Sequence, residues 1–313
     1  MPAHRAPIAA WLKASRAVHA MFAGPGLRAT RSALTDEVVA ALRSEGVYVT
    51  TVQRLLGPAA AACTQAMADA AALVADLDRD AQVRWQRAAA STDLAHDELL
   101  ARLPALFMLG LDATMLAIAG QYLRVPVAYH GAVLRHSRVD GRRVGPRRWH
   151  HDAEDFHVLR TVLYLNDVDA DGGPFEYVPR GLRARARRAV GVDGMCDDEQ
   201  MAASVPRELW KRCTGPAGTL VIADSAQVFH HESLQRGAPR TVLMVGHASR
   251  RPRDPALAQA HFPAHRHAEA LARLVPRELH PVLFDWRRPE LALPDEAPEP
   301  EPVAPVLPDF MRG

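Results

Sequence analysis

The chain has 313 residues, 48% of them hydrophobic and 24% charged, with a formal net charge of +2. This composition is ordinary for a globular protein with one large core or two small ones. The small net charge excludes a strong overall field for nucleic acid or an acidic membrane. Three scattered cysteines without CxxC spacing argue against a disulfide framework or a zinc cage and favour a reducing cytoplasm.

Residues 1–33 are basic and rich in small side chains, and we interpret them as a cytoplasmic N-terminal extension, with a transit peptide as the alternative. Residues 34–57 predict a helix that closes at Gly46, followed by a strand. Residues 58–92 are rich in Ala with helical spacing, and residues 93–121 predict one or two further helices. The apolar stretch 103–120 is interrupted by Pro, Gly and Asp, so we expect no membrane span.

The pattern changes near Val125, where short runs rich in Val, Leu, Ile and Tyr begin. The predicted strands cover residues 125–136, 158–166, 175–178, 218–223 and 240–247. Short strands at this spacing, without helices between them, predict a β-sandwich or barrel and argue against a doubly wound sheet. Residues 254–274 predict helix again, and the Pro- and Glu-rich residues 288–313 predict a flexible tail.

A histidine and an aspartate two residues apart, His150 and Asp152, open the strand-rich half. If this segment is extended, the two side chains share a face and His151 points the other way. They then supply two of the three protein ligands of an Fe(II) facial triad, which leaves three positions open.

A third ligand has to come from a distant strand, and the candidates are His230 and its neighbour His231, after the apolar run 218–223. Arg240 opens the next predicted strand, where a guanidinium could hold the far end of a dicarboxylate through paired hydrogen bonds. Arg135 could contact such an acid or remain a solvated strand arginine.

The runs 149–155 and 162–179 closely resemble the phytanoyl-CoA dioxygenase-like family, and 224–233 resembles its distal-histidine motif. In that motif a small polar turn precedes Phe-His, so the spacing after Asp224 and the preceding Phe favour His230 over His231. The resemblance implies a double-stranded β-helix (jelly roll), an α+β fold with a mainly β core, supported by N-terminal and C-terminal helices. It implies one oxygenase domain over residues 34–287, with a mainly helical part at 34–124, a jelly-roll core at 125–250 and a helical segment at 251–287.

The same resemblance implies the cofactors and the reaction. The metal ligands would be His150, Asp152 and His230, and Arg240 would bind the distal carboxylate of 2-oxoglutarate. The co-substrate would become succinate and CO2 while O2 oxidises an unactivated C–H of a small molecule. Because Asp152 is present, hydroxylation is favoured over halogenation. The family often has a hydroxyl residue just after the distal histidine, whereas here Glu232 takes the near position and Ser233 follows it.

Two other functions remain open from the sequence. One is a metal-dependent oxygenase of similar fold that does not use 2-oxoglutarate, against which Arg240 argues. The other is a binding protein that has lost catalysis, against which the intact triad argues. The identity of the substrate, the oligomeric state and the role of the basic run 183–188 are not readable from the sequence.

Overall fold

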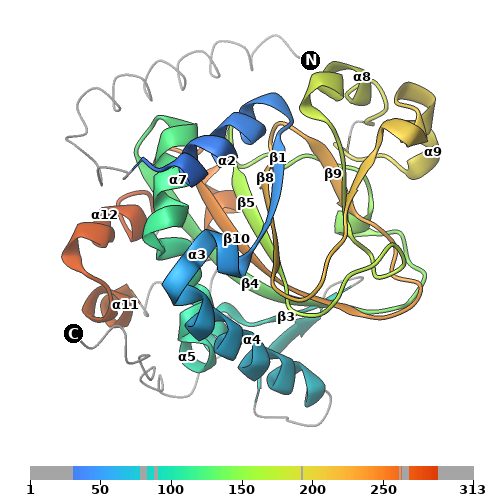
Figure 1. The fold of residues 1–313 in the computed structure, drawn as a ribbon. Helices are drawn as coiled ribbons and strands as arrows, with labels where there is room; N and C mark the ends of the chain where they lie inside the picture. Colours follow the sequence, from blue (N-terminus) through green and yellow to red (C-terminus); the bar gives the residue numbers. More distant parts are fainter. Residues whose placement is uncertain are drawn as a thin grey trace.

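The computed structural model describes residues 31–77, 83–87, 91–191, 193–260, 262 and 268–287. Most of the predicted N-terminal extension and the predicted tail at 288–313 lie outside them. Two antiparallel sheets face each other, with helices on the far side of the larger one (Figure 1). The large sheet has the order β1-β8-β5-β10-β4-β3-β2, and the small sheet has the order β7-β6-β9.

The strands of the large sheet are β1 (Val47–Thr51), β2 (Trp85–Arg87), β3 (Ser91–Leu94), β4 (Val127–Ser137), β5 (Leu159–Tyr164), β8 (Thr219–Asp224) and β10 (Arg240–Ser249). Those of the small sheet are β6 (Phe175–Val178), β7 (Lys211–Cys213) and β9 (Phe229–Glu232). Strand residues alternate between two apolar layers. On β5, Leu163 belongs to the layer under the helices, whereas Val162 and Tyr164 belong to the layer between the sheets.

The α-helices before the jelly-roll core are α2 (Ala33–Ser44), α3 (Val52–Leu56), α4 (Ala60–Ala75), α5 (His96–Arg102), α6 (Pro104–Met108) and α7 (Ala113–Leu123). Those within and after it are α8 (Arg183–Ala186), α9 (Asp198–Ser204), α10 (Pro255–Gln259), α11 (Ala268–Leu274) and α12 (His280–Leu283). Short 3-10 turns lie at 57–59, 109–111, 145–147, 180–182, 207–209 and 277–279. In Figure 1, α2, α7 and α12 cover the large sheet, while α8 and α9 lie at the end nearer β9.

Local sequence explains the entry into the fold. Ser32 and Thr35 form a capping box that starts α2, slightly earlier than the sequence predicts. Gly46 has φ of +89°, which lets the chain leave the helix and enter β1. A Cβ at this position would lie 2.3 Å from Val228 Cγ1, so the close approach of the two segments also requires glycine.

The five strands predicted after residue 125 are confirmed as β4, β5, β6, β8 and β10. The prediction of a mainly helical part at 34–124 did not include β2 and β3, which lie there and pair with each other and with β4. These strands are only three and four residues long, too short to show an alternating pattern. Among the described residues no single helix is long and apolar enough to cross a membrane, although 104–111 and 113–123 pass that test as a pair bent by 40°.

Candidate metal centre

The alternation of side chains along β9 separates its two histidines. Tyr177 of β6 lies opposite His230, and Phe175 lies opposite Glu232. Phe175 and Tyr177 belong to the apolar layer between the sheets, so His230 and Glu232 face that interior. The ring of Phe175 stacks on His230 with centroids 5.1 Å apart. His231 therefore points to the outer side of the small sheet.

His150 reaches the same interior because its backbone pairs with β9. The amide of His150 donates to the carbonyl of His230 at 3.0 Å, and the amide of His230 donates back at 2.9 Å. This bridge adds the segment of His150 beside β9 as a further short edge of the small sheet. The predicted extended segment is confirmed at Trp149 and His150, and the two imidazole centroids lie 4.4 Å apart.

Asp152 completes the group that the sequence predicted. Its Oδ1 lies 4.0 Å from Nε2 of His150 and 4.0 Å from Nε2 of His230. The three ligand atoms all lie within 4.8 Å of one another. The side chains keep 16%, 15% and 9% of their surface exposed for His150, Asp152 and His230 respectively, so the group is largely buried but still reached by solvent.

Backbone carbonyls fix which nitrogen of each histidine is available. Nδ1 of His150 lies 2.8 Å from the carbonyl of Arg148, and Nδ1 of His230 lies 3.3 Å from the carbonyl of Val228. A carbonyl can only accept, so each Nδ1 carries the proton and each Nε2 presents its lone pair to the centre. Two imidazole nitrogens and one carboxylate oxygen form a donor set that suits Fe(II).

The other oxygen of Asp152 is held from outside the centre. Oδ2 accepts from Ser225 Oγ at 2.6 Å and from Nε of Arg160 at 3.2 Å, which leaves Oδ1 free. Burial alone would raise the pKa of Asp152, but the neighbouring Arg160 guanidinium and the hydrogen bond from Ser225 hold it well below its ordinary value. The carboxylate is therefore ionised and aimed before any metal binds.

Arg160 also pairs with a second buried carboxylate, Glu154. Burial, reinforced by Asp152, raises the pKa of Glu154 to about 7 in spite of this arginine. Neither Arg160 nor Ser225 is among the site residues predicted from the sequence. Arg160 could have been noticed in the sequence as a charged residue on the inward face of β5. That face otherwise carries the apolar side chains of Val162 and Tyr164.

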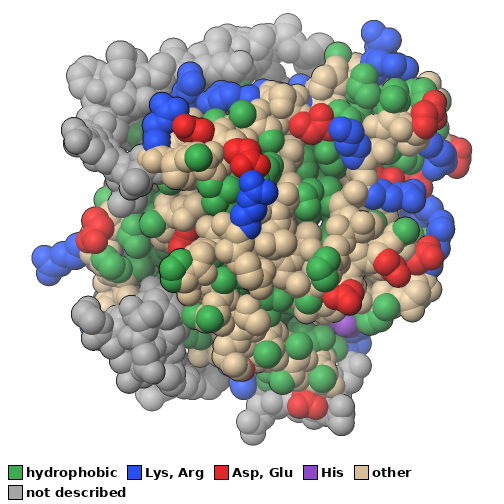
Figure 2. All heavy atoms as spheres, in the orientation of Figure 1, with side chains coloured by type: hydrophobic (Ala, Val, Ile, Leu, Met, Phe, Trp, Pro, Cys, Tyr) green, Lys and Arg blue, Asp and Glu red, His purple; other side chains and the backbone are tan. Residues whose placement is uncertain are grey.

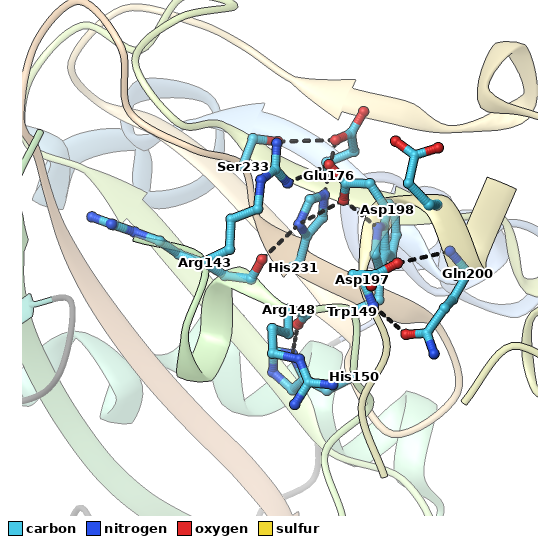
Figure 3. A network of polar contacts seen from close by, with 12 residues as sticks. Arg143, Arg148, Trp149, His150, Glu176, Asp197, Asp198, Gln200, His231 and Ser233 are labelled. Atoms are coloured by element: carbon cyan, nitrogen blue, oxygen red, sulfur yellow. Dashed lines mark hydrogen bonds and ion pairs between the residues drawn. The ribbon is translucent and has the colours of Figure 1, made fainter. Parts of the chain in front are cut away.

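His231 belongs to a separate network on the outer side (Figure 3). Its Nε2 lies 2.8 Å from Glu176, and its ring stacks on Trp149 with centroids 4.0 Å apart. The indole of Trp149 donates to Asp198 at 2.9 Å. Both ring nitrogens of His231 have protein partners, since Nδ1 lies 3.3 Å from the carbonyl of Arg147. The structure thus places His230, and not His231, beside Asp152.

The three residues predicted to bind the co-substrate already have protein partners. Arg240 pairs with Glu232 at 2.6 Å. Ser233 donates to Glu176 at 3.0 Å, on the outer side of the small sheet. Arg135 holds both oxygens of Asp93, with its Nη2 at 2.6 Å from Oδ2.

Charges elsewhere show no single-sign field on the face drawn in Figure 2, where acidic and basic side chains are interspersed. Within the basic run 183–188, Arg187 lies 3.2 Å from Nε2 of His151, on the side of that segment away from the triad. A cavity of about 490 Å³ lies elsewhere. It is lined by Val74, Ala75, Leu77, His136, Arg138, Val139 and Pro239.

Comparison with known proteins bears on the fold. No protein-family model and no curated protein matches the sequence. Among solved structures, the chain is similar to the epimerase SnoN, described in complex with Fe3+, alpha ketoglutarate and nogalamycin RO, at 17% identity and a TM-score of 0.50 over 88% of this chain and 97% of that one. It is also similar to EctD from S. alaskensis in its apoform, at 21% identity and a TM-score of 0.50 over 74% and 82%. The predicted jelly-roll fold is confirmed.

Buried neutral histidines make the stability of the metal-free protein depend on pH. Burial lowers the pKa of His230 to about 3 and that of His247 to about 4. Unfolded histidine has a pKa of about 6.5, so below that pH the unfolded state binds protons that the folded state does not. We expect each of these imidazoles to lower the free energy of unfolding by about 1.4 kcal/mol per pH unit from pH 6.5 to pH 4.5. Glu154 opposes one of them, because its raised pKa lets the folded state bind a proton over the same range, and the net change is still a fall.

Denaturant titrations at several pH values would measure this slope. Nε2 of His247 lies 2.6 Å from the carbonyl of Gly110, a contact that a glutamine amide can replace. His247→Gln should therefore reduce the slope of the free energy of unfolding against pH by the contribution of one proton, about 1.4 kcal/mol per pH unit. A stability that stays constant between pH 6.5 and 4.5 would contradict the expectation.

Proposed function

We propose that the protein is a non-haem Fe(II) oxygenase that uses 2-oxoglutarate and O2 to oxidise a small molecule. One observation carries the proposal: two Nε2 atoms and one carboxylate oxygen converge within 4.8 Å, each fixed by a hydrogen bond on its far side. An Fe(II) ion held by these three ligands would have positions left for a 2-oxo acid and O2. It would supply activation of O2 coupled to decarboxylation of the 2-oxo acid.

The residues of the chain would divide the work as follows. His150, Asp152 and His230 hold the metal, and Arg160 and Ser225 keep Asp152 turned toward it. Arg240 supplies a guanidinium in the interior for the far carboxylate of 2-oxoglutarate. We propose smaller roles in binding 2-oxoglutarate for Arg135 and Ser233. Arg135 already pairs with Asp93, and Ser233 already donates to Glu176.

We further propose hydroxylation of an unactivated C–H as the outcome, because Asp152 occupies the ligand position that halogenation would require to be open. The runs at 149–155 and 162–179 support a place among the phytanoyl-CoA dioxygenase-like enzymes. We also propose that residues 34–287 form one oxygenase domain and that the protein works in the cytoplasm.

A second candidate is a metal-dependent oxygenase of this fold that does not use 2-oxoglutarate. The pairing of Arg240 with Glu232 favours it, because the guanidinium that would recognise the co-substrate already has a carboxylate.

An anaerobic titration separates the two candidates. Purified protein is loaded with Fe(II) and titrated with 2-oxoglutarate while the weak visible charge-transfer band of the chelate is followed. The leading proposal expects the band and, in air with a panel of small molecules, release of succinate. Iron that binds without producing either signal would leave the second candidate.

A further inference from the structure

The ion pair between Glu232 and Arg240 lies inside the jelly roll. Glu232 Oε2 and Arg240 Nη2 are 2.6 Å apart, and the two side chains keep 6% and 5% of their surface exposed. Glu232 belongs to β9 of the small sheet and Arg240 to β10 of the large sheet, so the pair joins the two sheets across the interior. Desolvated ion pairs of this kind are strongly sensitive to loss of one partner.

Glu232 shares the inward face with the candidate ligand His230. The two residues are two positions apart on one strand, so their Cα atoms are separated by about 7 Å. That separation is comparable with the length of a five-carbon dicarboxylate. A 2-oxo acid held beside His230 would therefore be long enough to reach the carboxylate of Glu232.

The guanidinium of Arg240 can still donate a hydrogen bond to a ligand. Its Nη1 donates to the carbonyl of Gly173 at 2.6 Å and its Nη2 faces Glu232. Its Nε is buried and has no hydrogen-bond partner among the described residues. A buried donor without a partner is costly, so the position suits an additional acceptor.

The charges around this pair are balanced without any ligand. Arg240 is matched by Glu232, and Arg135 is matched by Asp93. Arg147 approaches Glu232 at 3.5 Å, but it also pairs with Asp140. A second carboxylate placed here therefore brings excess negative charge, whereas a neutral group in place of Glu232 would leave a positive charge to be satisfied.

We propose that Glu232 is a specificity-determining residue that competes with the far carboxylate of 2-oxoglutarate for Arg240; the inference rests on the proposed function. The native protein then discriminates weakly between 2-oxoglutarate and a 2-oxo acid that ends in a neutral group. When the charge of Glu232 is removed, Arg240 pairs with the far carboxylate of the co-substrate instead. The protein then strongly prefers the dicarboxylate.

Two co-substrates of equal carbon number test the proposal. 2-Oxopentanoate carries a methyl group where 2-oxoglutarate carries its far carboxylate, and both chelate iron through the same end. Dissociation constants are measured anaerobically with Fe(II) from the chelate band, for the native protein, Glu232→Gln and the control Glu176→Gln. Glu176 is also buried, but it faces the outer network of His231. Melting temperatures report whether each variant is folded.

We expect 2-oxoglutarate to bind less than about tenfold more tightly than 2-oxopentanoate in the native protein, and Glu232→Gln to raise that ratio by at least about tenfold. Glu176→Gln should leave the ratio unchanged. An unchanged or smaller ratio in Glu232→Gln overturns the proposal. If Glu232→Gln does not fold, the native ratio decides, and a value above about tenfold overturns it.

The proposed function fails in a different way. In that case iron binds, but neither 2-oxo acid produces the chelate band in the native protein or in Glu232→Gln. The competition proposal falls with it. A band with both acids and no change of ratio removes the role of Glu232 alone.

Discussion

Asp152→Ala is expected to abolish iron-dependent turnover and to weaken Fe(II) binding by more than about 100-fold. Loss of a residue that merely orients a ligand typically costs 10- to 100-fold in metal affinity, so loss of the ligand itself should cost more. Oδ1 of Asp152 lies 4.0 Å from Nε2 of His150 and 4.0 Å from Nε2 of His230, so the substitution removes the carboxylate oxygen that faces both imidazoles. Anaerobic equilibrium dialysis against Fe(II) measures the affinity, and succinate release measures the turnover.

The neighbouring histidines provide a matched control. His150→Ala should lose iron to a similar extent, whereas His151→Ala should retain native affinity, because the ring of His151 packs edge-on against Phe229 instead of facing Asp152. Iron binding that depends on His151 and survives His150→Ala would contradict the ligand assignment.

Arg160→Met is expected to lower the free energy of unfolding of the metal-free protein by about 3–5 kcal/mol. Arg160 keeps 14% of its side chain exposed and pairs with both Asp152 and Glu154. Its loss leaves two buried carboxylates close together without a cation. Because a divalent metal restores positive charge there, added metal should stabilise this variant more than the native protein.

Chemical denaturation with and without metal measures both effects. Arg207→Met is a control of the same size at an exposed ion pair with Glu199, where about 0–1 kcal/mol is expected. If Arg160→Met and Arg207→Met cost the same, the buried pairing contributes little to stability.

The local sequence pattern was sufficient to predict part of the candidate metal centre. The spacing of His150 and Asp152 predicts a common face for any extended segment, and the structure brings both side chains to one centre. Side-chain alternation alone could not choose between His230 and His231, because either residue faces inward in one of the two possible registers, and the resemblance only favoured His230. The pairing of His230 with Tyr177 of β6 fixes that register, and it is a contact between distant parts of the chain.

The charges around the centre depend on tertiary structure that sequence spacing does not encode. Glu232 and Arg240 meet because β9 and β10 belong to opposing sheets. Arg160 reaches Asp152 from β5. The spacing of the strands predicted a β-sandwich or barrel, and the resemblance implied the jelly roll. In contrast, β2 and β3 were too short to be distinguished from their helical surroundings.

A metal bound by His150 and His230 would crosslink the two segments that the backbone bridge between these residues already pairs. The two residues are far apart in the sequence, and a metal held by both would close that long segment into a loop. A reversible crosslink of this kind restricts the unfolded chain and must be broken before the edge segment of His150 can separate from β9. Metal loading should therefore slow unfolding and delay proteolysis of the whole segment between the two histidines.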